Sequence, residues 1–278
     1  MMTIKQRVAF LSRMKRFCIA FLFVPCPLLF SQESRILYQN GKHKEATTFL
    51  QEENIVLNSA WATLLARSFI HASYRNHFLT KELHYCSLSA GWHLKGNLLF
   101  SGLQHDGYAP FGRLQINAGY GRQFGHRVGI SMRFYYDIEH AYRYPSRHSF
   151  TFDIACATRL NDKISAGFVA YNPARLKYGF TGTVIPTLLR INGYYTLNKK
   201  ICIAWGLQQQ LPGKFDVDVG VCYAYSLLCL SWVSAFTYTE CAVRLSVKAW
   251  CVGMFARYTY RLGFVPECKI SYAFGHEK

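Results

Sequence analysis

Three short groups of residues carry side chains that could act as acids, bases or metal ligands. His105-Asp106-Gly107-Tyr108 combines an imidazole, a carboxylate and a phenol in a predicted turn region, while Glu139-His140 and His148 flank a basic, tyrosine-rich loop. Neither a nucleophile motif nor a ligand spacing such as HxxxH accompanies these groups. We therefore predict that these are solvated loop residues, and that the chain is not an enzyme and has no cofactor.

Two other patterns resemble known sites only superficially. Gly119-Tyr120-Gly121 is rich in glycine, as phosphate-binding loops are, but it lies within an alternating segment and not between a strand and a helix. The cysteines show no CxxC or metal spacing, which predicts small apolar packing residues and no metal site. Those that follow residue 31 are Cys86, Cys156, Cys202, Cys222, Cys229, Cys241, Cys251 and Cys268.

The N-terminus has the pattern of a cleaved secretory signal. Five basic residues precede the apolar run 17–30, and the small residue Ser31 follows it, so we assign residues 1–31 to a signal peptide whose translation starts at Met1 or Met14. A helical anchor is the alternative, although Pro25 and Pro27 interrupt a run that is already short. Removal of the five basic residues lowers the formal charge from +17 to +12.

Residues 32–66 form a separate, mostly polar zone. A short helix is predicted within 38–53, where Ala46, Phe49 and Leu50 share one side, but this zone cannot form a core alone. A periplasmic extension, a plug and a disordered leader all remain open for it.

From residue 67 to residue 278 the side chains alternate with a period of two, which is typical of half-buried strands. Leu114, Ile116 and Tyr120 share one face, and Gln115 and Asn117 lie on the other. The segments number about fourteen and are close to the length of about 9 to 11 residues that a tilted strand needs to cross a bilayer. The pattern predicts an all-β fold, an antiparallel transmembrane β-barrel in the outer membrane; a soluble secreted β-protein is the alternative.

The face predicted to line the barrel carries charges of both signs. Opposite charges inside a barrel can pair and fill the interior, or they can form a polar constriction on a substrate path. The candidate lumen-facing residues are Arg133, Asp137, Asp153, Arg190, Asp216, Asp218, Arg244 and Arg257.

Several stretches resemble a family of outer-membrane barrels from Bacteroidetes-type bacteria that is related to the FadL-like transporters and to the PorV and PorQ proteins of type IX secretion. These stretches are 73–83, 171–175, 185–190 and 262–266. The resemblance spans about residues 58–274 and implies a barrel of fourteen strands. The family usually has an Asn-Pro-Ala motif after a Gly- and Ala-rich segment that packs in the lumen, whereas this chain has Asn58-Ser59-Ala60 after a polar segment.

The predicted function is that of a non-enzymatic barrel, either for passage of hydrophobic small molecules or as an accessory to a protein secretion system. A surface lipid-modifying hydrolase is the enzymatic alternative. Outer-membrane lipid and lipopolysaccharide are the expected partners of the basic chain, together with secretion-system proteins in the accessory case. Nucleic acid is not expected, because the Lys and Arg residues are scattered and form no recognition motif.

Overall fold

The computed structural model describes residues 58–65, 67–80, 83–108, 110–177, 184–260 and 262–274. The predicted signal peptide and residues 32–57 lie outside the described residues. No helix among the described residues is long and apolar enough to cross a bilayer. The described elements are α4 (Ala60–Leu65), β1 (Ser68–Asn76), β2 (His84–Leu94), β3 (Asn97–Tyr108), β4 (Phe111–Phe124), β5 (Val128–Ala141), β6 (Tyr144–Arg159), β7 (Ile164–Tyr171), β8 (Thr187–Thr196), β9 (Ile201–Leu211), β10 (Lys214–Tyr225), β11 (Leu228–Ala235), β12 (Tyr238–Val247), β13 (Trp250–Thr259) and β14 (Gly263–Phe274).

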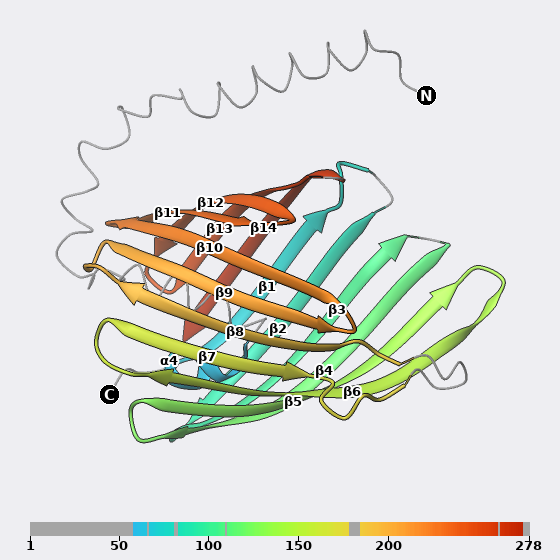
Figure 1. Cartoon of the computed structure of the whole chain (residues 1–278), viewed down its shortest axis with the longest axis horizontal. Helices are drawn as coiled ribbons and strands as arrows, with labels where there is room; N and C mark the ends of the chain where they lie inside the picture. Colours follow the sequence, from blue (N-terminus) through green and yellow to red (C-terminus); the bar gives the residue numbers. More distant parts are fainter. Residues whose placement is uncertain are drawn as a thin grey trace, which may run out of the picture. The chain divides into compact units, whose positions relative to one another are not determined.

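The strands form one closed antiparallel barrel in which each strand pairs with its neighbours in the chain (Figure 1). The barrel closes where β1 pairs with β14, with Ser68 opposite Phe274 and Arg75 opposite Glu267. Closure gives every strand two partners and leaves no unpaired edge, which a membrane-spanning sheet requires because lipid offers no hydrogen bonds. The predicted barrel of about fourteen strands is confirmed.

The connections differ between the two ends of the barrel. At the turn end, β2–β3 and β10–β11 are joined by two residues each, and the β6–β7 and β8–β9 connections at 160–163 and 197–200 lie there too. At the loop end, β1–β2 and β7–β8 are joined by the longer segments 77–83 and 172–186. The basic, tyrosine-rich loop predicted between His140 and His148 is mostly strand instead, because β5 continues to Ala141 and β6 begins at Tyr144, which leaves a tight turn between them.

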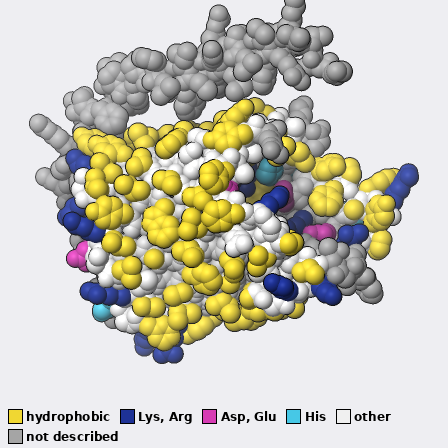
Figure 2. Space-filling view, viewed as in Figure 1, with side chains coloured by type: hydrophobic (Ala, Val, Ile, Leu, Met, Phe, Trp, Pro, Cys, Tyr) yellow, Lys and Arg dark blue, Asp and Glu magenta, His cyan; other side chains and the backbone are white. Residues whose placement is uncertain are grey.

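The alternation places apolar side chains on the outside of the barrel. Leu103, Ile116 and Tyr120 are all close to half exposed, and they belong to a large set of exposed Leu, Ile, Val, Phe, Tyr and Trp side chains. Figure 2 shows hydrophobic side chains over most of the visible barrel wall, with Lys and Arg mainly toward its margins. Such a surface is unfavourable in water and matches the hydrocarbon of a bilayer, so the barrel spans a membrane.

Trp205 illustrates how the outer face is packed. Gly193 lies opposite Trp205 on the neighbouring strand, and a Cβ added to Gly193 would lie 2.4 Å from the indole ring. The ring therefore lies over the glycine and covers backbone that would otherwise face lipid, as large aromatics do beside strand glycines.

Candidate functional site

The short helix α4 lies against the inner side of the barrel wall near its turn end. Asn58 begins the helix as an N-cap, because its side-chain oxygen accepts a hydrogen bond of 3.0 Å from the backbone N–H of Ala60. The Thr63 hydroxyl donates to the Ala60 carbonyl at 2.7 Å. All residues from Asn58 to Leu64 are almost fully buried, although six helical residues have little stability alone. The surrounding barrel therefore holds α4 in place.

Three inward-facing glycines form the seat of α4. A Cβ at Gly129 would lie 2.0 Å from the Thr63 hydroxyl and 2.8 Å from the Ala60 carbonyl oxygen, and one at Gly121 would lie 2.5 Å from the Thr63 methyl group. Gly167 gives the same space to Asn58, whose side-chain nitrogen would lie 2.7 Å from an added Cβ. A larger residue at these positions would push α4 away from the wall.

Polar and aromatic contacts fix the helix further. The hydroxyls of Ser59 and Ser131 are 2.8 Å apart, and Arg159 donates to the Leu64 carbonyl at 3.1 Å. The ring of Trp61 meets Tyr194 edge to face, with centroids 5.1 Å apart. Ala60, Trp61 and Leu64 belong to one apolar cluster with alanines and cysteines of the wall. We call Asn58–Leu65 the plug from here on.

Beyond the plug, ion pairs join neighbouring strands of the lumen wall. Arg133 pairs with Asp153 at 2.8 Å, and both side chains are almost fully buried. Tyr135 also donates a hydrogen bond to Asp153. Other pairs of one Arg with one acid are Arg113–Asp137 at 2.9 Å, Arg190–Asp218 at 3.0 Å, Arg257–Glu240 at 2.7 Å and Arg75–Glu267 at 2.9 Å.

Some of the eight candidate lumen-facing residues form ion pairs with each other, and others pair with residues outside that set. Arg133 with Asp153, and Arg190 with Asp218, are the pairs formed between predicted residues. Asp137 and Arg257 pair with Arg113 and Glu240, which the sequence analysis did not single out, and Arg244 donates to the Ser231 hydroxyl at 2.8 Å. Asp216 accepts from the Thr237 hydroxyl in the β11–β12 connection at 2.9 Å.

The missed residues could have been found from the same alternation. Arg113 precedes Gln115 and Asn117 at a spacing of two, and Glu240 precedes Ala242 and Arg244 in the same way. Extending each inward face toward the loop end would have included both residues, together with Arg75 and Glu267.

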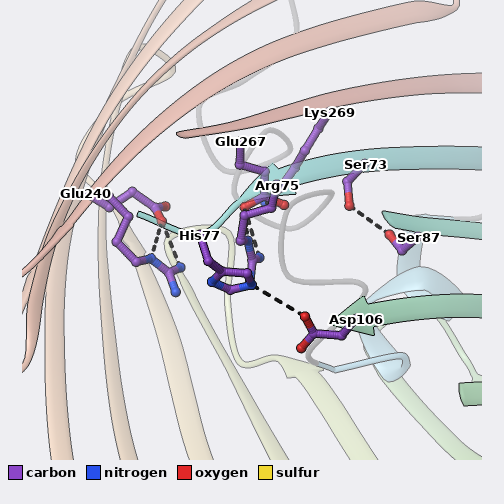
Figure 3. Close-up of polar contacts among 9 residues, drawn as sticks. Ser73, Arg75, His77, Ser87, Asp106, Glu240, Glu267 and Lys269 are labelled. Atoms are coloured by element: carbon purple, nitrogen blue, oxygen red, sulfur yellow. Dashed lines mark hydrogen bonds and ion pairs between the residues drawn. The ribbon is translucent and has the colours of Figure 1, made fainter. Parts of the chain in front are cut away.

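A group of polar side chains lies at the loop end (Figure 3). His77 Nε2 is 3.7 Å from Asp106 Oδ1, and Arg75 lies beside them in its pair with Glu267. Burial lowers the pKa of His77, the positive charge of Arg75 lowers it further, and the carboxylate of Asp106 acts in the opposite direction. The neutral imidazole is therefore favoured at this end of the lumen.

A cavity lies beside the plug. It is a small space of about 30 Å³, and Ser59 and Ala62 of the plug form part of its lining. The wall contributes the rings of Phe69 and Phe100, the guanidinium-bearing Arg133, and a set of small polar residues consisting of Ser87, Ser89, Ser101, Gln104 and Asn117. This lining combines apolar faces with hydroxyl and amide groups around a space that holds about two water molecules.

His105 and His148, two of the histidines considered for acid–base chemistry, do not come together as a site. His105 to Tyr108 belong to β3, so their assignment to a turn region is wrong, and His105 stacks on His84 with ring centroids 5.6 Å apart. His148 bonds the Tyr136 hydroxyl at 2.9 Å. His105 and His148 lie on β3 and β6, three strand spacings apart, or about 14 Å. Within the described ranges, no group of three or more His, Cys, Asp or Glu side chains could hold a metal ion.

Comparison with known proteins shows similarity at the level of the fold. No protein-family model matches the chain, and no curated protein matches it. Among solved structures, a TodX deltaS2S3 mutant monoaromatic hydrocarbon channel is similar with a TM-score of 0.60 and 8% identity, covering 80% of this chain and 94% of that one. The CymD monoaromatic hydrocarbon channel gives a TM-score of 0.56 and 10% identity, covering 81% and 94%. The KdgM porin gives 0.47 and 14%, covering 74% and 99%.

The closed antiparallel barrel, its apolar exterior and its similarity to the TodX and CymD folds define the class of protein. The chain has the architecture of an outer-membrane β-barrel.

Proposed function

We propose that the chain is a non-enzymatic outer-membrane channel for small hydrophobic molecules, and that the plug controls passage at the turn end. The observation that carries this proposal is the construction of the plug. It is a short helix on the inner side of the wall, seated on three glycines and held by a few hydrogen bonds. A small shift of α4 on this seat would open a path through the lumen at the turn end. If the lumen were filled by side chains of the wall, many strands would have to move to open it.

The chemistry beside the plug favours apolar cargo. The apolar cluster that includes α4 consists of alanine, valine, tyrosine and cysteine side chains of the wall, and the cavity presents Phe69 and Phe100. Arg113, Arg133 and Arg190 of the lumen are each paired with an aspartate, so this part of the lining does not select ions of one charge. The TodX and CymD structures, which share the fold, are monoaromatic hydrocarbon channels, and this supports the same cargo class.

Uptake by intact cells tests the proposal. A lipopolysaccharide leaflet hinders apolar solutes, so cells that express the chain should take up radiolabelled toluene faster than cells with an empty vector. Gly129→Ala should raise uptake further, because the added methyl group displaces Thr63 and Ala60. Gly112→Ala is the matched control, since its Cβ meets nothing closer than the His105 ring at 3.6 Å. Uptake equal to the empty vector for the wild type and for Gly129→Ala would overturn the proposal.

The alternative is a fixed accessory of a secretion system. The observation that favours it is the burial of Asn58 to Leu64, because a barrel occupied at one end can act as an anchor without passing any solute. Gently solubilised membranes distinguish the two functions. Copurification of secretion-system proteins in a fixed ratio to the chain, without toluene uptake, would support the accessory role. Purification of the barrel with no partner protein would count against it.

A further inference from the structure

Three cysteines meet inside the barrel near its turn end. Cys202 on β9 lies directly opposite Cys222 on β10, and Cys229 follows on β11. All three are fully buried, and all three belong to the apolar cluster that contains Trp61 of the plug. They differ in this respect from Cys86, Cys241 and Cys268, which are exposed on the barrel surface.

Two of these sulfur atoms are in closer contact than packing alone requires. Cys222 Sγ and Cys229 Sγ are 2.9 Å apart, which is about 0.9 Å more than a covalent sulfur–sulfur bond. Ala224 lies opposite Cys229, and Ser231 lies opposite Cys222, so the two cysteines form a diagonal pair across a tight hairpin. Both side chains point to the same face of adjacent strands, and closing the remaining gap of about 0.9 Å would bring the two sulfurs to bonding distance.

We propose that Cys222 and Cys229 form a disulfide that links β10 to β11 near the plug. The oxidant is a protein disulfide of the periplasmic dithiol–disulfide class. The thiolate of one cysteine attacks this disulfide, and the second cysteine then displaces the oxidant from the mixed disulfide. The two cysteines together lose two protons and two electrons, and the oxidant leaves as a dithiol.

The burial of both sulfurs determines when this reaction takes place. An oxidising protein cannot reach side chains that are fully buried within the barrel, so the bond forms before the barrel closes. The predicted signal peptide would deliver the unfolded chain to a compartment in which disulfides form and persist. A disulfide across this short hairpin would fix the register of β10 and β11 early in assembly.

Peptide mapping of the full chain tests the proposal. Outer membranes are quenched with N-ethylmaleimide in denaturant, and the chain is digested without reductant. Trypsin leaves Cys222, Cys229 and Cys241 together in the peptide 215–244, and chymotrypsin cuts after Tyr225 between the first two. The expected result is a linked pair of chymotryptic peptides that contain Cys222 and Cys229, with Cys241 alkylated as an internal control.

Three single variants make the result specific. Cys222→Ala should free Cys229 for alkylation and Cys229→Ala should free Cys222, while Cys241→Ala should leave the link intact. Purified chain that is unfolded and refolded with glutathione disulfide should regain the link, whereas chain folded under reductant and then exposed to glutathione disulfide should not. Complete alkylation of Cys222 and Cys229 in the wild type, or a link from Cys202 to Cys222, would overturn the assignment even if a variant failed to fold.

Discussion

The Arg133–Asp153 pair should be the most sensitive electrostatic contact in the barrel wall. Two guanidinium nitrogens of Arg133 donate to Asp153 Oδ2 at 3.0 and 2.8 Å, and the side chains are only 8% and 2% exposed. Asp153→Asn keeps the size of the side chain and removes its charge, which leaves a buried guanidinium beside a neutral amide. Removing one partner of a buried ion pair costs about 3 to 5 kcal/mol. The ring of Tyr135, 4.9 Å from the guanidinium carbon, retains part of the stabilisation, so we expect about 3 kcal/mol.

Urea unfolding of the barrel in lipid vesicles measures this loss. With a slope of about 2 kcal/mol per molar urea, the midpoint should fall by about 1.5 M. Asp162→Asn, in the exposed β6–β7 turn, is the control and should leave the midpoint unchanged. The double variant Arg133→Met with Asp153→Leu should recover most of the loss, because it removes both buried charges. A midpoint for Asp153→Asn within experimental error of the wild type would refute the assignment of this pair as a buried, stabilising contact.

Three further perturbations test the plug and the loop end. Trp61→Ala should destabilise the folded chain by about 3 kcal/mol or more in the same urea assay, because it empties the space of a fully buried indole; no loss would mean that the plug is not seated. Gly129→Ala should raise the conductance of planar bilayers above that of the wild type and of Gly112→Ala; equal conductance would show that the contact with Thr63 does not close the lumen. Because the folded pKa of His77 lies below the unfolded value of 6.5, the stability that it contributes is present above pH 6.5 and is lost as the pH falls below it. His77→Gln should therefore flatten the decline of melting temperature between pH 7 and pH 5, and an unchanged decline would contradict this role.

The sequence predicted the wall of the barrel well because one physical constraint repeats along it. Each strand has one face toward lipid and one toward the lumen, so residues such as Ile116 and Asn117 reveal their faces by type alone. Closure follows from the same constraint, since an open edge cannot be satisfied in lipid. The strand count and both faces could therefore be predicted without knowing any contact.

Contacts between strands were less predictable, because they depend on register and on the lengths of the connections. Asp137 and Arg113 pair because β4 and β5 meet in a register that places Asp137 opposite Gln115, next to Arg113 along the inner face. The polar, tyrosine-rich segment around Tyr144 was interpreted as a loop because it lacks apolar alternation, yet backbone pairing between β5 and β6 continues through it.

The sequence did not decide whether this segment forms a plug, because the helix is stabilised by tertiary contacts with the barrel wall. Asn58-Ser59-Ala60 lacks the proline of the family that it resembles, and the preceding segment is polar. The helix α4 fits against the wall because Gly121, Gly129 and Gly167, three glycines from three different strands, have no side chains there. Such a seat appears only when these strands are placed side by side.

Tryptophan fluorescence in vesicles of brominated lipid tests the central claim, a lipid-facing barrel with the plug inside, most directly. The chain has five tryptophans; Trp92, Trp205, Trp232 and Trp250 are exposed on the outer wall, and Trp61 is fully buried in the plug. Bromine quenches only indoles that contact the lipid chains. The account predicts strong quenching of the wild type and none of a variant in which the four outer tryptophans are replaced by phenylalanine. Absence of quenching in the wild type would contradict it. So would quenching of the four-fold variant, in which Trp61 is the remaining tryptophan, as strong as that of the wild type.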